Sequence, residues 1–147
     1  MSDDVNLARA MRASTDLLQN EEYDKALQLL DSAIDAAMKS GEKSHWISTV
    51  CNHCAVIGDF AGRHDLTRRY YEQCLAYDAD NPRALNGLAK IFLEGGDAEL
   101  AKTYATKCYN IVIHSADRKW GGLLDLITHR WPDLGAQSSR LQLHWLI

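Results

Sequence analysis

Residues 82–115 read PRALNGLAKIFLEGGDAELAKTYATKCYNIVIHS and predict two helices joined by a tight turn. Pro82 suits the first turn of a helix, where its missing N–H leaves no hydrogen bond unmade. Apolar residues then recur at helical spacing, at Leu85, Leu88 and Phe92. A turn follows at Gly96 and Asp97, because glycine adopts positive φ readily and aspartate caps the start of a helix. A second apolar stripe predicts the second helix, at Leu100, Ala101, Tyr104 and Cys108.

The same pattern repeats along the chain with a period of 34 residues. Residues 48–81 align with residues 82–115, so that Gly62 falls on Gly96. Residues 7–40 align as a further copy when the seven residues before the second copy are treated as an insertion. One helix pair cannot bury its apolar face alone, so three copies predict pairs stacked on one another.

Each copy carries a motif of large, small and aromatic positions at fixed spacing. The third copy supplies Leu85, Leu88, Ala89, Phe92, Gly96, Asp97, Ala101, Ala105 and Cys108. The second supplies Cys51, Cys54, Ala55, Gly58, Gly62, Thr67, Tyr71 and Cys74. The first supplies Ala10, Ala13, Ser14, Leu17, Ala26, Leu30 and Ala33. This pattern resembles the tetratricopeptide repeat family over residues 7–115. It departs from the family at Gly58, where a bulky residue is expected, and at Ala105, where an aromatic one is expected.

The resemblance implies an all-α fold that makes residues 1–147 a single domain. The family's architecture is a right-handed superhelical stack of antiparallel helix pairs, an α-solenoid. Its repeats are expected here at about 7–40, 48–81 and 82–115. The first helices of the family line a concave groove that holds an extended or helical peptide. The resemblance therefore implies a protein-binding module that uses no cofactor.

Residues 116–147 are expected to form C-terminal capping helices that close the stack. Apolar side chains fall on one helical face, at Trp120, Leu123, Leu124, Ile127 and Trp131. Pro132 ends this helix, and a short last helix is expected at about 136–146. Residues 143–147 are unusually apolar for a chain terminus. They leave open an alternative function, a self-assembling structural module in which the apolar C-terminus joins protomers into a homo-oligomer.

Composition and charge exclude several classes of function. The 147 residues include 16 basic and 20 acidic side chains, a formal net charge of −4, so the basic face that nucleic acid requires is missing. No apolar stretch reaches the roughly 18 residues of a membrane-spanning helix. The acidic start at residues 1–4 is unlike a signal peptide. We therefore expect a cytoplasmic protein with free thiols and with no nucleic-acid or membrane partner.

Cys51, Cys54 and His53 are the candidates for a metal site or an active site. A C-x-x-C spacing beside a histidine can bind zinc. On a helix, however, His53 lies about 100° from Cys54, and no second C-x-x-C or H-x-x-x-H pair completes four ligands. All four cysteines fall in core columns of the repeat, so we expect them to act as small buried hydrophobic residues. The sequence predicts no metal and no catalysis, with a metal protein or enzyme at this corner as the less favoured alternative.

Polar residues of the first helices are the candidate peptide-binding residues. They are Thr15, Asn52, His53, Arg83, Asn86 and Lys90. The amides of Asn52 and Asn86 can hydrogen-bond a peptide backbone, and Arg83 and Lys90 can meet an acidic ligand. We therefore expect a non-catalytic adaptor, scaffold or co-chaperone-like protein. Its partner, a protein or peptide segment of open identity, would bind in the concave groove.

Overall fold

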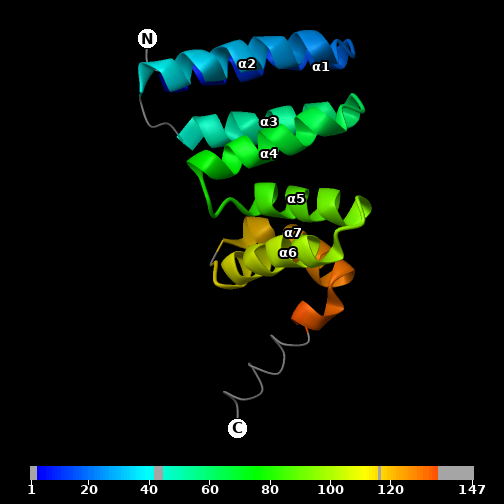
Figure 1. Cartoon of the computed structure of the whole chain (residues 1–147). Coiled ribbons are helices and arrows are strands. Elements are labelled where there is room, and N and C mark those ends of the chain that lie inside the picture. Colours follow the sequence, from blue (N-terminus) through cyan, green and yellow to red (C-terminus); the bar gives the residue numbers. More distant parts are fainter. Residues whose placement is uncertain (1–2, 42–44, 116, 136–147) are drawn as a thin grey trace. The chain divides into compact units, whose positions relative to one another are not determined.

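The computed structural model describes residues 3–41, 45–115 and 117–135, which fold into helices joined by short turns (Figure 1). The helices are α1 (Asp3–Gln19), α2 (Tyr23–Ser40), α3 (His45–Phe60), α4 (His64–Tyr77), α5 (Pro82–Glu94), α6 (Ala98–Ile113), the 3-10 helix η1 (Arg118–Trp120) and α7 (Gly121–Arg130). These ranges contain no β-strand, so the all-α prediction is confirmed. None of their helices combines the length and apolar character needed to cross a bilayer. By its internal contacts the chain forms two compact units, Met1–Ala79 and Asp80–Ile147.

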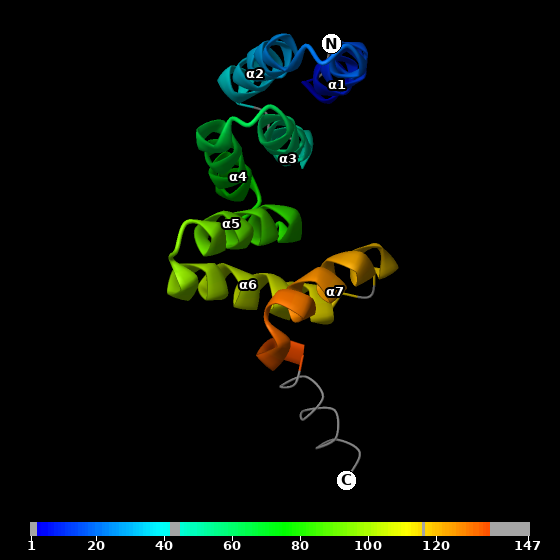
Figure 2. The ribbon, with the colours of Figure 1, turned by 90° about the vertical axis from the view of Figure 1, so that its right-hand side faces the viewer.

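The first unit contains two antiparallel helix pairs. α1 pairs with α2 and α3 with α4, and α3 also packs against α1 and α2, so the second pair lies on the first (Figures 1 and 2). Fully buried side chains fill this unit, among them Leu7, Leu30, Ile34, Ile47, Val50 and Tyr70. The hydroxyl of Tyr70 donates a 2.7 Å hydrogen bond to Asp31, which joins α4 to α2.

The second unit contains one helix pair and a shorter C-terminal helix. α5 pairs with α6, and α7 packs against α6 (Figure 2). The core of this unit includes Leu85, Leu88, Cys108, Ile127, Trp131 and Leu134. Of the apolar face predicted from Trp120 onward, Ile127 and Trp131 are buried and the other three side chains are half-buried. The predicted last helix, at about 136–146, lies outside the described residues.

Each helix pair turns through the same hydrogen-bonded motif at the same repeat position. One residue adopts positive φ: Glu21 (57°), Gly62 (72°) and Gly96 (90°). Its N–H donates to the carbonyl three residues back, over 3.0, 3.1 and 3.3 Å respectively. The next N–H donates to the carbonyl five residues back, over 2.8, 2.8 and 2.9 Å. This is the Schellman motif, which satisfies carbonyl groups at the end of a helix. Its recurrence confirms the turns predicted from the repeat.

The small-residue columns of the repeat are buried, with exceptions in the first copy. Ala26, Thr67 and Ala101 are between 0 and 3% exposed. All four cysteines are 0% exposed, which confirms that they are core residues. Ala13, predicted at a core position, is instead exposed, and Ala33 is half-buried.

α3 begins earlier than the repeat alignment predicts. The seven residues before residue 48 are predicted to be an insertion, yet α3 begins at His45 and Ile47 is fully buried. Gly41, with φ at 75°, ends α2. Burial of Ile47 stabilises an additional turn at the start of α3. Aligning the repeats with one another does not reveal this turn.

Candidate functional site

The outward face of α5 carries three of the six predicted peptide-binding residues. Asn81 fixes the start of this helix, because its side chain accepts a 3.2 Å hydrogen bond from the N–H of Ala84. With the apolar stripe of α5 buried, Arg83, Asn86 and Lys90 share another face at i, i+3 and i+7. Arg83 and Lys90 are exposed, whereas Asn86 is half-buried.

Arg83 and Lys90 are positively charged side chains without an ion-pair partner among the described residues of the second unit. Lys102 and Lys107, on α6, instead pair with Asp133 and Asp80. Arg83 and Lys90 are therefore two exposed cations on α5 that an acidic ligand could meet, although exposed Glu94 lies four residues beyond Lys90 on the same side of the helix.

Asn86 lies between these two cations along the helix, with its carbonyl oxygen unsatisfied. Its Oδ1 is buried and accepts no hydrogen bond from the part of the chain that the structure describes. A buried acceptor without a donor costs about 1–3 kcal/mol. The side chain as a whole is half-buried, so its amide lies at the edge of the core. Because this oxygen is buried, a bound peptide would reach it only if neighbouring side chains moved aside.

A side chain from outside α5 joins this face. Trp120, the last residue of η1, has its ring centroid 5.6 Å from the guanidinium carbon of Arg83. The ammonium of Lys119 lies 4.9 Å from the same centroid and 3.4 Å from a carboxylate oxygen of Asp117. The backbone N–H of Lys119 also donates to Asp117 over 3.0 Å, which lowers the pKa of that carboxyl group. Sequence periodicity missed this contact, because it placed Trp120 in the cap and Arg83 in a repeat.

The other three predicted residues lie in the first unit. Thr15 is exposed on α1, where its hydroxyl donates a 3.3 Å hydrogen bond to the carbonyl of Met11. Asn52 and His53 are half-buried on α3. Burial lowers the pKa of His53, because the charged imidazolium loses hydration. The six residues fall three to each unit, and a single groove that holds all six stays a prediction.

Two exposed apolar side chains lie beside His53 on α3. Val56 and Phe60 are 44% and 75% exposed. They follow His53 by three and seven residues, so the three side chains share one side of α3. Exposed apolar side chains gain free energy when a partner covers them, but no described residue indicates which partner that is.

The cysteine corner is a poor candidate for metal binding or catalysis. Cys51 and Cys54 are fully buried, and burial raises the pKa of Cys51 to about 12. Burial also raises the pKa of Cys54 above its ordinary value. Metal binding and nucleophilic attack both need the thiolate, which this environment disfavours. Among the described residues, no group of three or more His, Cys, Asp and Glu side chains is placed to hold a metal ion.

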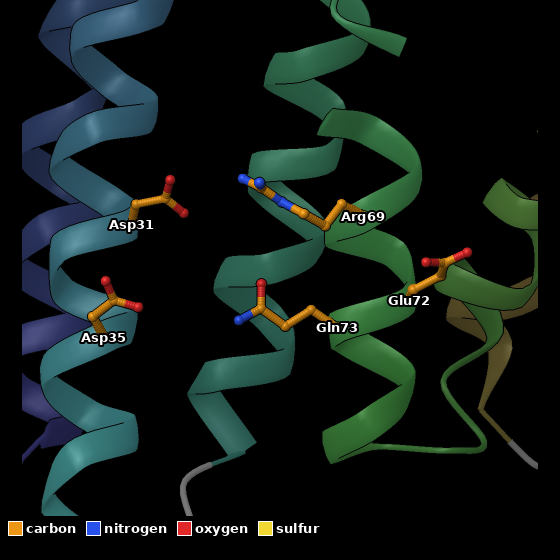
Figure 3. Close-up of a pocket in the computed structure, with 5 residues that line it drawn as sticks. All are labelled: Asp31, Asp35, Arg69, Glu72 and Gln73. Atoms are coloured by element: carbon orange, nitrogen blue, oxygen red, sulfur yellow. The ribbon is translucent and has the colours of Figure 1, made fainter. Parts of the chain in front are cut away.

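A polar pocket lies between α2 and α4 of the first unit (Figure 3). It is lined by Asp31, Asp35, Arg69, Glu72 and Gln73. Figure 3 shows the two aspartates of α2 facing Arg69 and Gln73 of α4. Asp31 already accepts the Tyr70 hydrogen bond, and Glu72 pairs with Arg68 over 2.8 Å. These groups serve contacts inside the unit, so we assign no ligand to the pocket.

A scan against models of known protein families and a search of curated proteins found no match to this chain.

Proposed function

We propose that the chain is a non-catalytic module that binds a peptide segment of another protein, as an adaptor or scaffold. In this proposal the helix pairs belong to a tetratricopeptide-like stack with right-handed superhelical twist, working in the cytoplasm. Three pairs that turn through the same motif support a repeat architecture. The observation that carries the function is the exposed side of α5, where Arg83 and Lys90 form no ion pair with a described residue of their unit and flank the half-buried Asn86.

The chemistry of this face favours an acidic peptide. Carboxylates of the ligand would meet Arg83 and Lys90, and charge-assisted hydrogen bonds of this kind are stronger than neutral ones. Arg83 and Lys90 are two helical turns apart, about 10 Å along the axis. The peptide would therefore carry two acidic groups separated by a few residues rather than adjacent ones.

Titration with labelled peptides tests the proposal. Three sets of equal length, acidic, neutral and basic, are mixed with the full chain and followed by fluorescence anisotropy. We expect the acidic set to bind most tightly. Replacing both cations, Arg83→Gln with Lys90→Gln, should weaken acidic peptides on the order of ten-fold or more. The melting temperature should barely change, since exposed substitutions shift stability by under about 0.5 kcal/mol.

The matched control removes two positive charges, the same number, from the first unit instead. Arg68→Gln with Arg69→Gln changes two exposed arginines of α4, and it should leave the affinity for acidic peptides nearly unchanged. If the α4 pair weakens binding and the α5 pair does not, the binding face is wrong. If acidic peptides bind no better than neutral ones, the proposed ligand class is wrong.

The alternative of a self-assembling module depends on the apolar end of the chain, residues 136–147, which lie outside the described residues. It stays a prediction that light scattering can test by comparing the full chain with one that lacks residues 141–147.

A further inference from the structure

Trp120 is the group that connects the face of α5 to the C-terminal part of the second unit. Its ring lies 5.6 Å from Arg83 and 4.9 Å from Lys119, both within the roughly 6 Å reach of a cation–π interaction. The ring is half-buried, whereas the arginine side chain is exposed.

The two cations at this ring differ in how they are neutralised. Lys119 is shared between the ring and the carboxylate of Asp117, 3.4 Å away. Arg83 contacts the ring and has no carboxylate partner among the described residues. The positive charge left at the ring therefore belongs to Arg83. A second cation beside it raises the local potential that an incoming anion meets.

Holding the guanidinium matters because an exposed arginine has many rotamers. A side chain that must be ordered on binding loses conformational entropy, which lowers affinity. Contact with a half-buried aromatic ring restricts the guanidinium before binding. It leaves the N–H edge able to bind a carboxylate through two parallel hydrogen bonds. A lysine at the same position offers no planar group to stack on the ring.

We propose that Trp120 is a positioning residue for acidic-peptide binding: it holds the guanidinium of Arg83 in place to receive a carboxylate of the ligand. This inference rests on the proposed function. The ring acts through Arg83 and does not itself contact the peptide. The C-terminal part of the second unit thereby contributes to recognition as well as to packing.

A double-mutant cycle on the full chain tests the inference, with an acidic peptide from the set above as the probe. Trp120→Ala should weaken binding about two- to five-fold, the range of an exposed cation–π contact. Trp120→Phe should retain most of the affinity, because phenylalanine keeps an aromatic face. Arg83→Ala should cost on the order of ten-fold, and adding Trp120→Ala to it should cost nothing further, because the ring acts only through the guanidinium.

Tryptophan fluorescence gives a second, independent readout. If Trp120 only stabilised the fold, adding peptide would not change its emission. Peptide binding should change the emission of the wild-type protein, and Trp120→Phe should abolish that change while binding persists. Lys102→Ala, on α6, serves as a control cation and should change neither affinity nor emission.

The outcomes separate this inference from the proposed function. If acidic peptides bind and Arg83→Ala weakens them, but Trp120→Ala does not, the positioning role is wrong and the proposed function stands. If Trp120→Ala weakens binding equally in the Arg83→Ala background, the ring contacts the ligand or supports the fold, and the positioning role is again wrong. If the wild-type chain does not prefer acidic peptides, both are wrong.

Discussion

At the scale of single residues, Gly58 shows why the repeat pattern departs from its expected form. A Cβ at this position would lie 2.8 Å from the hydroxyl of Thr67. Thr67 is buried and donates a 3.2 Å hydrogen bond to the carbonyl of Arg63. At the matching positions of the second unit, the first helix has Phe92 and the second has Ala101. The larger side chain thus lies on α4 in one pair and on α5 in the other.

Replacing Gly58 by alanine should therefore destabilise the protein. Alanine would gain up to about 1 kcal/mol in helix propensity, but overpacking against Thr67 costs about 1–3 kcal/mol. Urea unfolding measures the balance, and in a Thr67→Ala background the change should become neutral or stabilising. Gly122→Ala is the control, because nothing lies within 4 Å of its added Cβ. Stabilisation by Gly58→Ala in the wild-type background would contradict the argument.

The four cysteines should react slowly with thiol reagents in the native protein. All are fully buried, and burial raises the pKa of Cys51, Cys74 and Cys108 to about 12. Only a very small fraction is thiolate near neutral pH, and thiolate is the reactive form. Labelling with a chromogenic disulfide should thus be slow until denaturant is added. Rapid reaction of any two thiols in the native state would disprove their core position.

His53 should make the protein less stable as the pH falls below neutral. Its pKa in the folded state lies below the ordinary 6.5, because burial penalises the charged form. As the pH falls through about 6.5, the unfolded chain takes up a proton that the folded chain resists, so the free energy of unfolding decreases. His53→Gln should flatten this decline between neutral pH and the folded-state pKa. A decline as steep in His53→Gln as in the wild-type protein would contradict this role of His53.

At the scale of helices and turns, the repeat alignment predicts the turn positions better than the types of the turn residues do. Gly62 and Gly96 stand where a helix ends with positive φ, and glycine predicts such a turn by itself. Glu21 adopts the same conformation in the first pair. Only its alignment with the two glycines indicates the turn there. The early start of α3 escaped prediction because it depends on whether Ile47 finds a place in the core.

This recurrence makes a paired prediction for the turns. Glu21→Gly should stabilise the protein by up to about 1 kcal/mol, because an L-residue with left-handed φ is strained by about 1–2 kcal/mol. Gly96→Ala should destabilise by a similar amount, and purely through conformation, since its Cβ would meet nothing within 4 Å. Urea midpoints of the two variants should move in opposite directions. Equal shifts in the same direction would refute the shared turn geometry.

At the scale of the whole molecule, the sequence predicted the helix pairs and the buried columns better than the candidate site. Periodicity reports which side of a helix is buried, so it placed Arg83, Asn86 and Lys90 on one side of α5, where Arg83 and Lys90 are exposed and Asn86 is half-buried. It carries no information on contacts between elements that do not repeat. The approach of Trp120 to Arg83 is such a contact, since it depends on how η1 and α7 return to the helix pair.

Charge is also distributed unevenly over the molecule. Residues 1–79 contain thirteen acidic and eight basic side chains, whereas residues 80–147 contain seven and eight. An acidic peptide is therefore attracted locally by Arg83 and Lys90 but repelled by the net charge of −4. Salt screens both effects, and the Debye length is about 10 Å at 0.1 M.

The two contributions can be separated by the sign of the salt dependence. In the wild-type protein, close contacts with Arg83 and Lys90 should dominate, so affinity for an acidic peptide should fall as salt rises. With both changed to glutamine, mainly the net repulsion remains, and added salt should leave affinity unchanged or raise it. Dissociation constants over a salt series give both slopes. Equal negative slopes for the two proteins would mean that Arg83 and Lys90 are not the cations that an acidic ligand meets.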